Sequence, residues 1–268
     1  MAHKTIFITG GASGIGRAVA VKFGGQGWFV GLADVNEAGM RETAAMLPAG
    51  LSSTHKLDVR DRAAWDAALA ACATASAGKI DVVFNNAGIP LGGNLIDNNV
   101  AEIERCLDIN LKGVLFGAQA AHLWLKASAP GSCLLNTASA AGIYGSAGAS
   151  VYSATKFGVR AITECLDGEW APDEIKVADL MPSFIDTPLI DMNPNQQSNE
   201  QIRGRVTAAG MEITPVSEVA EAAWNAVHGT ALHTRVGKTA HRVAFAARWM
   251  PGRLRKMGRE SRKPLDGK

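Results

Sequence analysis

Tyr152 and Lys156 lie four residues apart in a segment with helical periodicity. This spacing places both side chains on one face of a helix, with the ammonium one turn from the phenol. A free tyrosine has a pKa of about 10 and is a poor base at neutral pH, but an adjacent ammonium stabilises the phenolate and lowers that pKa. The pair could therefore exchange a proton in acid–base catalysis. An ordinary amphipathic surface pair has the same spacing, so the pair alone leaves both interpretations open.

A glycine-rich turn follows the first apolar run of the chain. Gly10, Gly14 and Gly16 give a G-x3-G-x-G spacing between a predicted strand and a predicted helix. Residues without a Cβ let the backbone pass close to a pyrophosphate, and the helix N-terminus offers unpaired N–H groups to the phosphates. Glycine loops are common, but this one has the strand–turn–helix context that dinucleotide binding requires.

Asp34 ends the second predicted strand, 24 residues after Gly10. A carboxylate there can accept hydrogen bonds from both adenosine ribose hydroxyls and would repel a 2′-phosphate. Its neighbours Ala33 and Val35 are neutral, as is Ser13 in the turn, so no cation is placed to hold the 2′-phosphate of NADP. NAD is therefore favoured over NADP. The alternative is a surface aspartate that caps the next helix, which is compatible with either cofactor.

The elements that must position these residues alternate between short β-rich runs and longer helical patterns. The runs are continuously apolar, as is typical of parallel strands covered on both faces. The predicted strands are Thr5–Thr9, Trp28–Ala33, Thr54–Val59, Ile80–Asn85, Cys133–Thr137 and Lys176–Met181. The predicted helices are Gly16–Gly25, Glu37–Met46, Arg62–Ala77, Val100–Leu125, Tyr152–Trp170 and Ser217–His228. The alternation predicts an α/β fold with a doubly wound parallel sheet between two helix layers, the three-layer Rossmann fold.

Composition and charge fit one compact domain with a strongly basic C-terminal segment. The 268 residues are 47% apolar and 19% charged, with a net charge of +2 that is too small to argue for nucleic acid. From Arg235 to the end, eleven lysines and arginines oppose two acids, so residues 1–234 carry −7. We predict one catalytic domain over residues 1–240 and a basic, helix-like extension over 241–268, interrupted at Pro251 and Gly252. This extension would pack on the sheet or across a subunit interface, in preference to contacting a membrane.

Other functional classes lack their signatures. The four cysteines form no CxxC pair, and we predict that they are reduced and mostly buried. The histidines do not cluster at metal-ligand spacing, and neither HExxH nor GxSxG occurs, so no metal site is predicted. No signal-peptide pattern or apolar run of membrane-spanning length is present, which makes the cytoplasm the expected location.

Several motifs in a fixed order give the chain a resemblance to the short-chain dehydrogenase/reductase family, from Thr5 to about Pro188. They are TGGASGIG at Thr9–Gly16, the pair Asp58-Val59, Asn85-Asn86-Ala87-Gly88, Asn110 in DINLKG, Ser139 in NTASAAG, and Tyr152-x-x-x-Lys156. Any one of these could arise by chance, whereas the ordered set points to the compact single-domain branch of the family. Membership implies hydride transfer between a nicotinamide cofactor and an alcohol or ketone.

The resemblance assigns roles position by position. Tyr152 would be the acid/base, and Lys156 would lower its pKa and bind the nicotinamide ribose. Ser139 would orient the substrate oxygen, and Asn110 would hold a water beside Lys156 in a proton path to solvent. The cofactor set it implies is Gly10, Ser13, Gly14, Ile15, Gly16, Asp34, Asp58, Val59, Asn86, Ala87, Gly88, Tyr152, Lys156, Pro182, Ile185 and Thr187.

Two departures from the family pattern stand out. Where the family usually has Pro-Gly, this chain reads Pro182-Ser183, which affects the expected nicotinamide contacts but not cofactor binding. Many relatives end in a last strand that closes a tetramer interface, whereas the last 40 residues here read as basic and helical. A homodimer or homotetramer is expected, without a choice between them.

The substrate is expected to be a small hydrophobic secondary alcohol or ketone, such as an aromatic, terpenoid or steroid-like compound. The residues expected near it are largely apolar, without an arginine or lysine to hold a carboxylate or phosphate. They are Ser139, Ala141, Ile143, Tyr144, Tyr152, Phe184 and Leu189. The polar, turn-rich segment between Leu189 and Arg205 is the expected lid. Alternatives are a catalytically silent nucleotide-binding regulator, or a peripheral membrane enzyme for lipid-like substrates.

Overall fold

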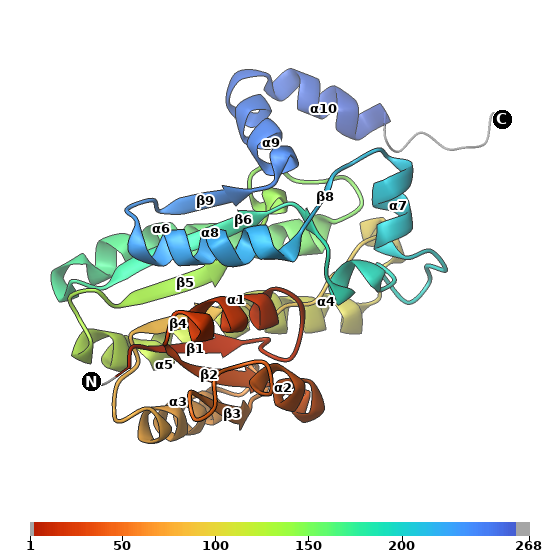
Figure 1. Ribbon diagram of the computed structural model, residues 1–268. Helices are drawn as coiled ribbons and strands as arrows, with labels where there is room; N and C mark the ends of the chain where they lie inside the picture. Colours follow the sequence, from red (N-terminus) through yellow and green to blue (C-terminus); the bar gives the residue numbers. More distant parts are fainter. Residues whose placement is uncertain (1–2, 261–268) are drawn as a thin grey trace.

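A parallel sheet of seven strands forms the centre of the computed structural model, which describes residues 3–260 (Figure 1). Its strand order is β3-β2-β1-β4-β5-β6-β9, and every neighbouring pair is parallel. The strands are β1 (Thr5–Thr9), β2 (Phe29–Asp34), β3 (Ser52–Lys56), β4 (Val82–Asn85), β5 (Cys133–Thr137), β6 (Lys176–Pro182) and β9 (His233–Val236). The order reverses between β1 and β4, which is where sheets of this kind bind ligands outside their carboxyl ends.

Helices cover both faces of the sheet, so the predicted three-layer α/β fold is confirmed. The helices are α1 (Gly14–Gly25), α2 (Glu37–Ala44), α3 (Arg62–Ala75), α4 (Val100–Leu107), α5 (Gly113–Ala127), α6 (Ser150–Trp170), α7 (Ile202–Ala208), α8 (Val216–His228), α9 (Lys238–Trp249) and α10 (Pro251–Glu260). A separate pair of short strands, β7 (Phe184–Ile185) and β8 (Ile213–Thr214), lies outside the main sheet.

The core is divided by the sheet because successive strand residues point to opposite faces. Ile6 and Ile8 of β1 pack with α1, α2 and α8 in one apolar cluster. Phe7, between them, packs with α3 and α5 in the other, where Trp65 is fully buried. Both clusters are built on β1, β4, β5 and β6, which explains why these strands are apolar throughout.

The predicted helix Val100–Leu125 is wrong in one respect. The structure divides it into α4 and α5, separated by a π-helical turn at Asp108–Lys112. A π turn adds one residue to a turn and shifts the hydrogen-bond register without changing the polar–apolar pattern enough to be read from sequence. Such turns are frequent at functional sites, and this one contains Asn110.

The C-terminal segment also differs from its prediction. The last 40 residues are not only helical, because β9 adds a seventh strand beside β6. Within this pairing, the buried carboxylate of Asp179 accepts a hydrogen bond from His233 at 2.9 Å, and burial raises the pKa of Asp179. The helical part begins at Lys238 and breaks at Met250, one residue before the predicted interruption. Of the predicted extension 241–268, residues 261–268 lie outside the described part.

Candidate active site

The glycine turn after β1 has the backbone shape that its sequence predicts. Gly10 and Gly14 have φ angles of +69° and +53°, which residues with a Cβ rarely adopt. A Cβ on Gly16 would lie 2.1 Å from the carbonyl oxygen of Gly10, so α1 packs directly on the turn. Ser13 precedes α1 in an extended conformation and makes no side-chain capping bond, while Ile15 packs against the core.

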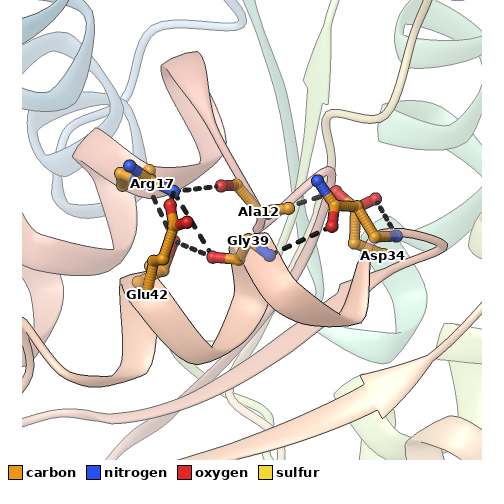
Figure 2. A network of polar contacts seen from close by, with 7 residues as sticks. Ala12, Arg17, Asp34, Gly39 and Glu42 are labelled. Atoms are coloured by element: carbon orange, nitrogen blue, oxygen red, sulfur yellow. Dashed lines mark hydrogen bonds and ion pairs between the residues drawn. The ribbon is translucent and has the colours of Figure 1, made fainter.

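Asp34 is fixed at the end of β2 by backbone hydrogen bonds to both carboxylate oxygens (Figure 2). Oδ2 accepts from the N–H of Ala12 in the glycine turn at 3.1 Å, and Oδ1 accepts from Asn36 at 2.9 Å. The alternative reading of Asp34 as a helix cap is wrong, because the Asn36 side chain caps α2 by accepting from Gly39. The carboxylate is thus tied to the glycine turn.

Arg17 is a cation near this acid that sequence reasoning did not weigh. Its guanidinium donates to the Ala12 carbonyl at 2.6 Å, to Thr43 Oγ1 at 3.0 Å and to Glu42 at 2.8 Å (Figure 2). These bonds hold the positive charge between α1 and α2, where Glu42 opposes it. The arginine therefore ties the two helices together around the turn.

Asp58 and Val59 follow β3 at the same edge of the sheet. Val59 is buried, and its side chain approaches Gly113 so closely that a Cβ there would lie 2.9 Å away. Asp58 forms an ion pair with Arg60, whose guanidinium donates to both carboxylate oxygens. This contact holds the pKa of Asp58 below its ordinary value. The arginine is a second local partner that the motif alone does not indicate.

The segment after β4 is hydrogen-bonded to the end of β1. Asn86 donates through Nδ2 to the Thr9 carbonyl at 2.9 Å, and the N–H groups of Asn86 and Ala87 both donate to Thr9 Oγ1. Gly88 lies beside Asn110, because a Cβ added to Gly88 would lie 3.3 Å from Asn110 Oδ1. This segment therefore joins β1 to the π turn.

Ser139, Tyr152 and Lys156 come together at the carboxyl end of β5. Ser139 follows β5 in extended conformation, and its Oγ accepts from Ala141 N–H at 3.1 Å and donates to the Pro182 carbonyl at 3.4 Å. Its hydroxyl is near enough to Tyr152 to affect the pKa of the phenol. Lys156 is 4% exposed, and its Nζ donates to the Thr137 carbonyl at 2.7 Å. Nζ lies 5.6 Å from the centre of the Tyr152 ring. The predicted one-face arrangement on α6 is present.

The electrostatics of this group differ from the sequence-based expectation. Burial raises the pKa of Tyr152 to about 12, although the Ser139 hydroxyl opposes this shift. Burial also lowers the pKa of Lys156 to about 8. The expectation of a lowered tyrosine pKa is therefore wrong for this structure, because desolvation raises the pKa of Tyr152 and the Lys156 ammonium is directed at the Thr137 carbonyl.

Asn110 lies fully buried in the π turn beside these residues. Its carboxamide makes two bonds to the backbone of Ile89, accepting its N–H and donating to its carbonyl, both at 2.8 Å. Nδ2 also lies 3.6 Å from the sulfur of Cys106. The side chain of Asn110 thus connects the π turn to the segment that follows β4.

The segment after β6 reaches across to the glycine turn. Pro182 ends β6, Ile185 is buried, and Thr187 Oγ1 donates to the Ile185 carbonyl. A Cβ on Gly14 would lie 3.3 Å from Cβ of Thr187. Ser183 takes the place of the expected glycine, with its N–H donating to the Val236 carbonyl.

The residues predicted to surround the substrate are partly exposed and lie along two short segments. Ala141, Ile143 and Tyr144 follow Ser139, and Phe184 and Leu189 follow β6. The predicted lid ends within α7, and Arg203 in it pairs with Asp186 at 2.7 Å and with Asp191 at 2.5 Å.

The lid contacts a segment that sequence reasoning did not identify. Asn195 Nδ2 donates to the Gly92 carbonyl at 2.9 Å, and Gly92 N–H donates to the Pro194 carbonyl at 2.8 Å. Gly93 in turn pairs with residues 148–149, just before α6. Three segments distant in sequence are thus joined above the catalytic group.

The described residues show neither a metal-binding cluster nor a membrane-spanning helix. Within residues 3–260, no group of three or more histidine, cysteine or acidic side chains is arranged to hold a metal ion. In the same range, no helix has the length and apolarity needed to cross a membrane.

Known proteins similar to this chain are oxidoreductases. A meso-2,3-butanediol dehydrogenase of Serratia marcescens is 31% identical over 80% of this chain and 85% of its own. A 3-alpha-(or 20-beta)-hydroxysteroid dehydrogenase of Mycobacterium bovis is 34% identical over 71% of this chain and 72% of its own. A short chain dehydrogenase/reductase from Burkholderia phymatum, solved in complex with NAD, superposes with a TM-score of 0.83 at 25% identity, covering 98% of this chain and 97% of its own.

The family model described as short chain dehydrogenase matches residues 4–201, which contain the glycine turn, Asp34, Ser139 and the Tyr152–Lys156 pair. This range is well over half of the chain, and the relatives above match it over most of their own length. The fold, the order of the motifs and these matches lead to one conclusion: the chain belongs to the short-chain dehydrogenase/reductase family.

Proposed function

We propose that the chain is an NAD-dependent oxidoreductase that transfers a hydride between the nicotinamide cofactor and a hydrophobic secondary alcohol or ketone. The observation that carries this proposal is the meeting of Tyr152, Ser139 and Lys156 at the carboxyl end of β5, next to the glycine turn. A proton donor and a substrate-orienting hydroxyl lie together, at the sheet edge where the cofactor would bind.

The glycine turn fits a dinucleotide. The positive φ angles of Gly10 and Gly14 and the close packing of Gly16 leave a cradle that side chains would fill. The first N–H groups of α1 are not capped by Ser13, so they are available to a pyrophosphate, as the positive end of the helix dipole favours. Ser13, Ile15, Asn86, Ala87 and Gly88 would line this cradle, with Pro182, Ile185 and Thr187 on its nicotinamide side.

Asp34 supports NAD over NADP. Each of its oxygens accepts one backbone N–H, which fixes the orientation of the carboxylate, and each oxygen can accept a ribose hydroxyl as well. The nearby Arg17 is held by Glu42 and the Ala12 carbonyl, so its charge is not directed at a 2′-phosphate. The Asp58 carboxylate would bind the adenine amino group and Val59 would pack beside the ring, while the same carboxylate stays paired with Arg60.

The side chains divide the chemistry between them. The bound nicotinamide would supply the hydride acceptor or donor. In alcohol oxidation the C–H bond breaks with its electron pair, and the hydroxyl proton passes to the oxygen of Tyr152. In ketone reduction the Tyr152 O–H bond breaks and its proton goes to the carbonyl oxygen. Ser139 would hold the substrate oxygen, and Lys156 would bind the ribose and keep a positive charge near the phenol.

The raised pKa of Tyr152 gives the two directions different pH dependences. At neutral pH the phenol keeps its proton, as ketone reduction requires. Alcohol oxidation needs the phenolate, so its rate should rise with pH up to about 8, above which the Lys156 ammonium also loses its proton. Asn110, buried in the π turn, would connect Lys156 to solvent through a water.

A hydrophobic substrate is supported by the residues around the catalytic group. Ala141, Ile143, Tyr144, Phe184 and Leu189 provide mostly apolar surface. Of the lid cations, Arg203 is already paired with two carboxylates and Arg205 with Glu200, so neither is free to hold an anionic substrate. The names of the butanediol and hydroxysteroid dehydrogenases above agree with an uncharged alcohol or ketone.

Assays of turnover with NAD and NADP on a panel of hydrophobic alcohols and ketones test the proposal, with Tyr152→Phe measured in parallel. The variant lacks the acid/base hydroxyl, so turnover should fall by about 10²–10⁴-fold while NAD affinity stays the same. Turnover that survives in the variant would overturn the role of Tyr152. Wild-type protein that binds NAD but turns over no member of the panel would favour a silent regulator, and activity confined to charged substrates would exclude the proposed class.

A further inference from the structure

The two last helices, α9 and α10, form a unit at one end of the molecule that we call the C-terminal hairpin (residues 238–260). Figure 1 shows it beyond the edge strand β9, projecting from the three-layer body. α9 is attached through Ala240, which is fully buried, and α10 packs against α9. No residue of α10 is buried. Much of the hairpin surface therefore faces away from the body.

Large apolar side chains lie on this outward surface. Phe245 is 59% exposed and Trp249 is 64% exposed, and their spacing of four puts them on one side of α9. Met250, at the end of α9, and Met257, in α10, are exposed as well. Trp249 is the one tryptophan of the six whose side chain is mainly exposed. Single exposed apolar residues are ordinary, but a group of this size indicates a contact surface.

The same hairpin is strongly basic. Between Arg235 and Glu260 the chain has eight lysines and arginines and one acid, Glu260. Among the described residues, the ion pairs of this segment are Lys238 with Glu212 and Lys256 with Glu260. Five arginines of the hairpin take part in no ion pair there, namely Arg242, Arg248, Arg253, Arg255 and Arg259. Residues 1–234, in contrast, carry −7, so positive charge is concentrated at one end.

We propose that the C-terminal hairpin docks the protein on an anionic lipid surface. Exposed Phe and Trp on a short helix, flanked by unpaired arginines, can insert the rings at the level of the headgroups while the guanidinium groups meet the lipid phosphates. The positive charge of the hairpin matches an anionic surface and disfavours one alternative, a contact between two hairpins. A two-fold contact between identical hairpins would bring their arginines together.

The hairpin is also attached next to the substrate side of the candidate site. It begins after Gly237, where a Cβ would lie 2.6 Å from Ser183 Oγ. α9 packs against the short helical turn Ala140–Gly142, directly after Ser139. Docking would therefore place the substrate-side loops near the lipid, from which an apolar substrate could enter. This consequence rests on the proposed function, whereas the docking itself does not.

Co-sedimentation of the full chain with vesicles tests the docking. The protein should bind vesicles of phosphatidylcholine mixed with phosphatidylglycerol, and it should not bind phosphatidylcholine alone. Binding should weaken in high salt because exposed charges are screened. The double variant Arg253→Ala/Arg255→Ala should lower the partition coefficient by about tenfold or more. Lys79→Ala/Arg105→Ala, which removes two exposed cations elsewhere, should not lower it.

The apolar part of the contact has its own readout, because Trp249 is the exposed tryptophan. Mixed vesicles that contain brominated lipid should quench its fluorescence, and Trp249→Phe should remove that quenching while keeping the binding. Phe245→Ser/Trp249→Ser should weaken binding, whereas Leu123→Ser, which changes a 75% exposed leucine on α5, should not. Thermal unfolding of each variant checks that the fold is intact.

Three results would overturn the docking proposal. One is equal sedimentation with both kinds of vesicle, and another is unchanged binding in the arginine double variant. The third is a dimer in sedimentation velocity that Phe245→Ser/Trp249→Ser abolishes, together with no vesicle binding, since a second copy would then cover the surface. None of these assays requires turnover, so their outcome is independent of the proposed reaction.

Discussion

The two halves of the sheet edge are built in different ways. On the side of β1, β2 and β4, the backbone itself makes the site, through Gly10, Gly14 and Gly16 and through N–H groups that bind Asp34 and Thr9. On the side of β5 and β6, side chains and loops make it. Ser139, Tyr152 and Lys156 lie together there, Lys156 is held by the Thr137 carbonyl, and the lid is held by contacts between distant segments.

The difference indicates how each half can vary. A site made of backbone tolerates few side chains, because a Cβ would collide with main-chain atoms that cannot move easily. A site made of side chains and a lid can accept new residues and so new substrates, while one proton-transfer group is kept. The predictions below test this division, starting with the half that should be more sensitive to change.

Gly16→Ala should have the largest effect. The added Cβ would lie 2.1 Å from the Gly10 carbonyl oxygen, so the glycine turn and α1 must separate. We expect NAD affinity to fall by about 10³-fold, or roughly 4 kcal/mol, which is the range of severe substitutions. Calorimetric titration with NAD measures it. Gly25→Ala, at the other end of α1, meets nothing within 4 Å and is the matched control. Equal NAD affinities in the two variants would contradict the division.

Asp34→Asn should come next, by changing cofactor preference with a side chain of the same size that keeps one of the two backbone hydrogen bonds. Loss of the charge weakens the hydrogen bonds to the ribose hydroxyls and removes repulsion of a 2′-phosphate. The ratio of kcat/KM for NAD to that for NADP should fall by about 10²-fold, or roughly 3 kcal/mol. Glu37→Gln, which removes an exposed negative charge at the start of α2, should change the ratio little. If both substitutions shift the ratio equally, the local field and not Asp34 sets the preference.

Sequence reasoning was most successful for the elements that local sequence determines, in both halves. The glycine turn and the strands β1, β2 and β5 were predicted almost to the residue, because local propensity and buried apolar runs determine them. The family and the fold also followed from the order of the motifs. The assigned roles of the individual residues, the extent of the domain and the oligomeric state stay predictions.

The failures concern features that depend on contacts between distant segments. β9 was missed because its four residues, HTRV, include three polar ones, and the strand is stabilised by pairing with β6 and by the bond between His233 and Asp179. The lid contact with Gly92 was missed because nothing near Asn195 in the sequence indicates its partner. The predicted direction of the Tyr152 pKa shift was wrong because the spacing of two residues does not report burial, and burial raises this pKa.

Lys156→Met tests the side-chain half through stability. The folded-state pKa of Lys156 is about 8 and its ordinary value is 10.5, so burial of the ammonium costs free energy. This cost is absent above pH 10.5, where the amine is neutral in both states. It grows as the pH falls from 10.5 to 8 and is fully present below pH 8. At pH 7 the methionine variant should therefore be more stable by roughly 2–3 kcal/mol, although it loses turnover. The advantage should shrink between pH 7 and pH 9.5, a window that stays below the Tyr152 titration.

Denaturant unfolding of wild type and Lys156→Met at both pH values measures this difference. Lys79→Met, at an exposed position, is the control and should show no pH-dependent advantage. A variant that is less stable than wild type at pH 7 would mean that the bond from Lys156 to the Thr137 carbonyl outweighs the cost of burial. The catalytic group would then be a stabilising part of the fold, and the two halves would differ less than we argue.

Gly93→Ala should have the smallest effect and should be confined to the lid. Gly93 has a φ of +99°, and a Cβ there would lie 2.2 Å from Asn195 Nδ2, so the Asn195 side chain must move and the lid loses its hydrogen bond to the Gly92 carbonyl. Gly50→Ala is the matched control, because Gly50 has a φ of +78° and meets nothing within 4 Å. Both variants should lose about 1 kcal/mol of stability from backbone strain. Only Gly93→Ala should raise KM for the ketone, by about tenfold or roughly 1.4 kcal/mol, with NAD affinity unchanged. If the two variants have the same KM, the lid contact does not contribute to substrate binding, and the substrate side would then be defined by the residues that follow Ser139 and β6.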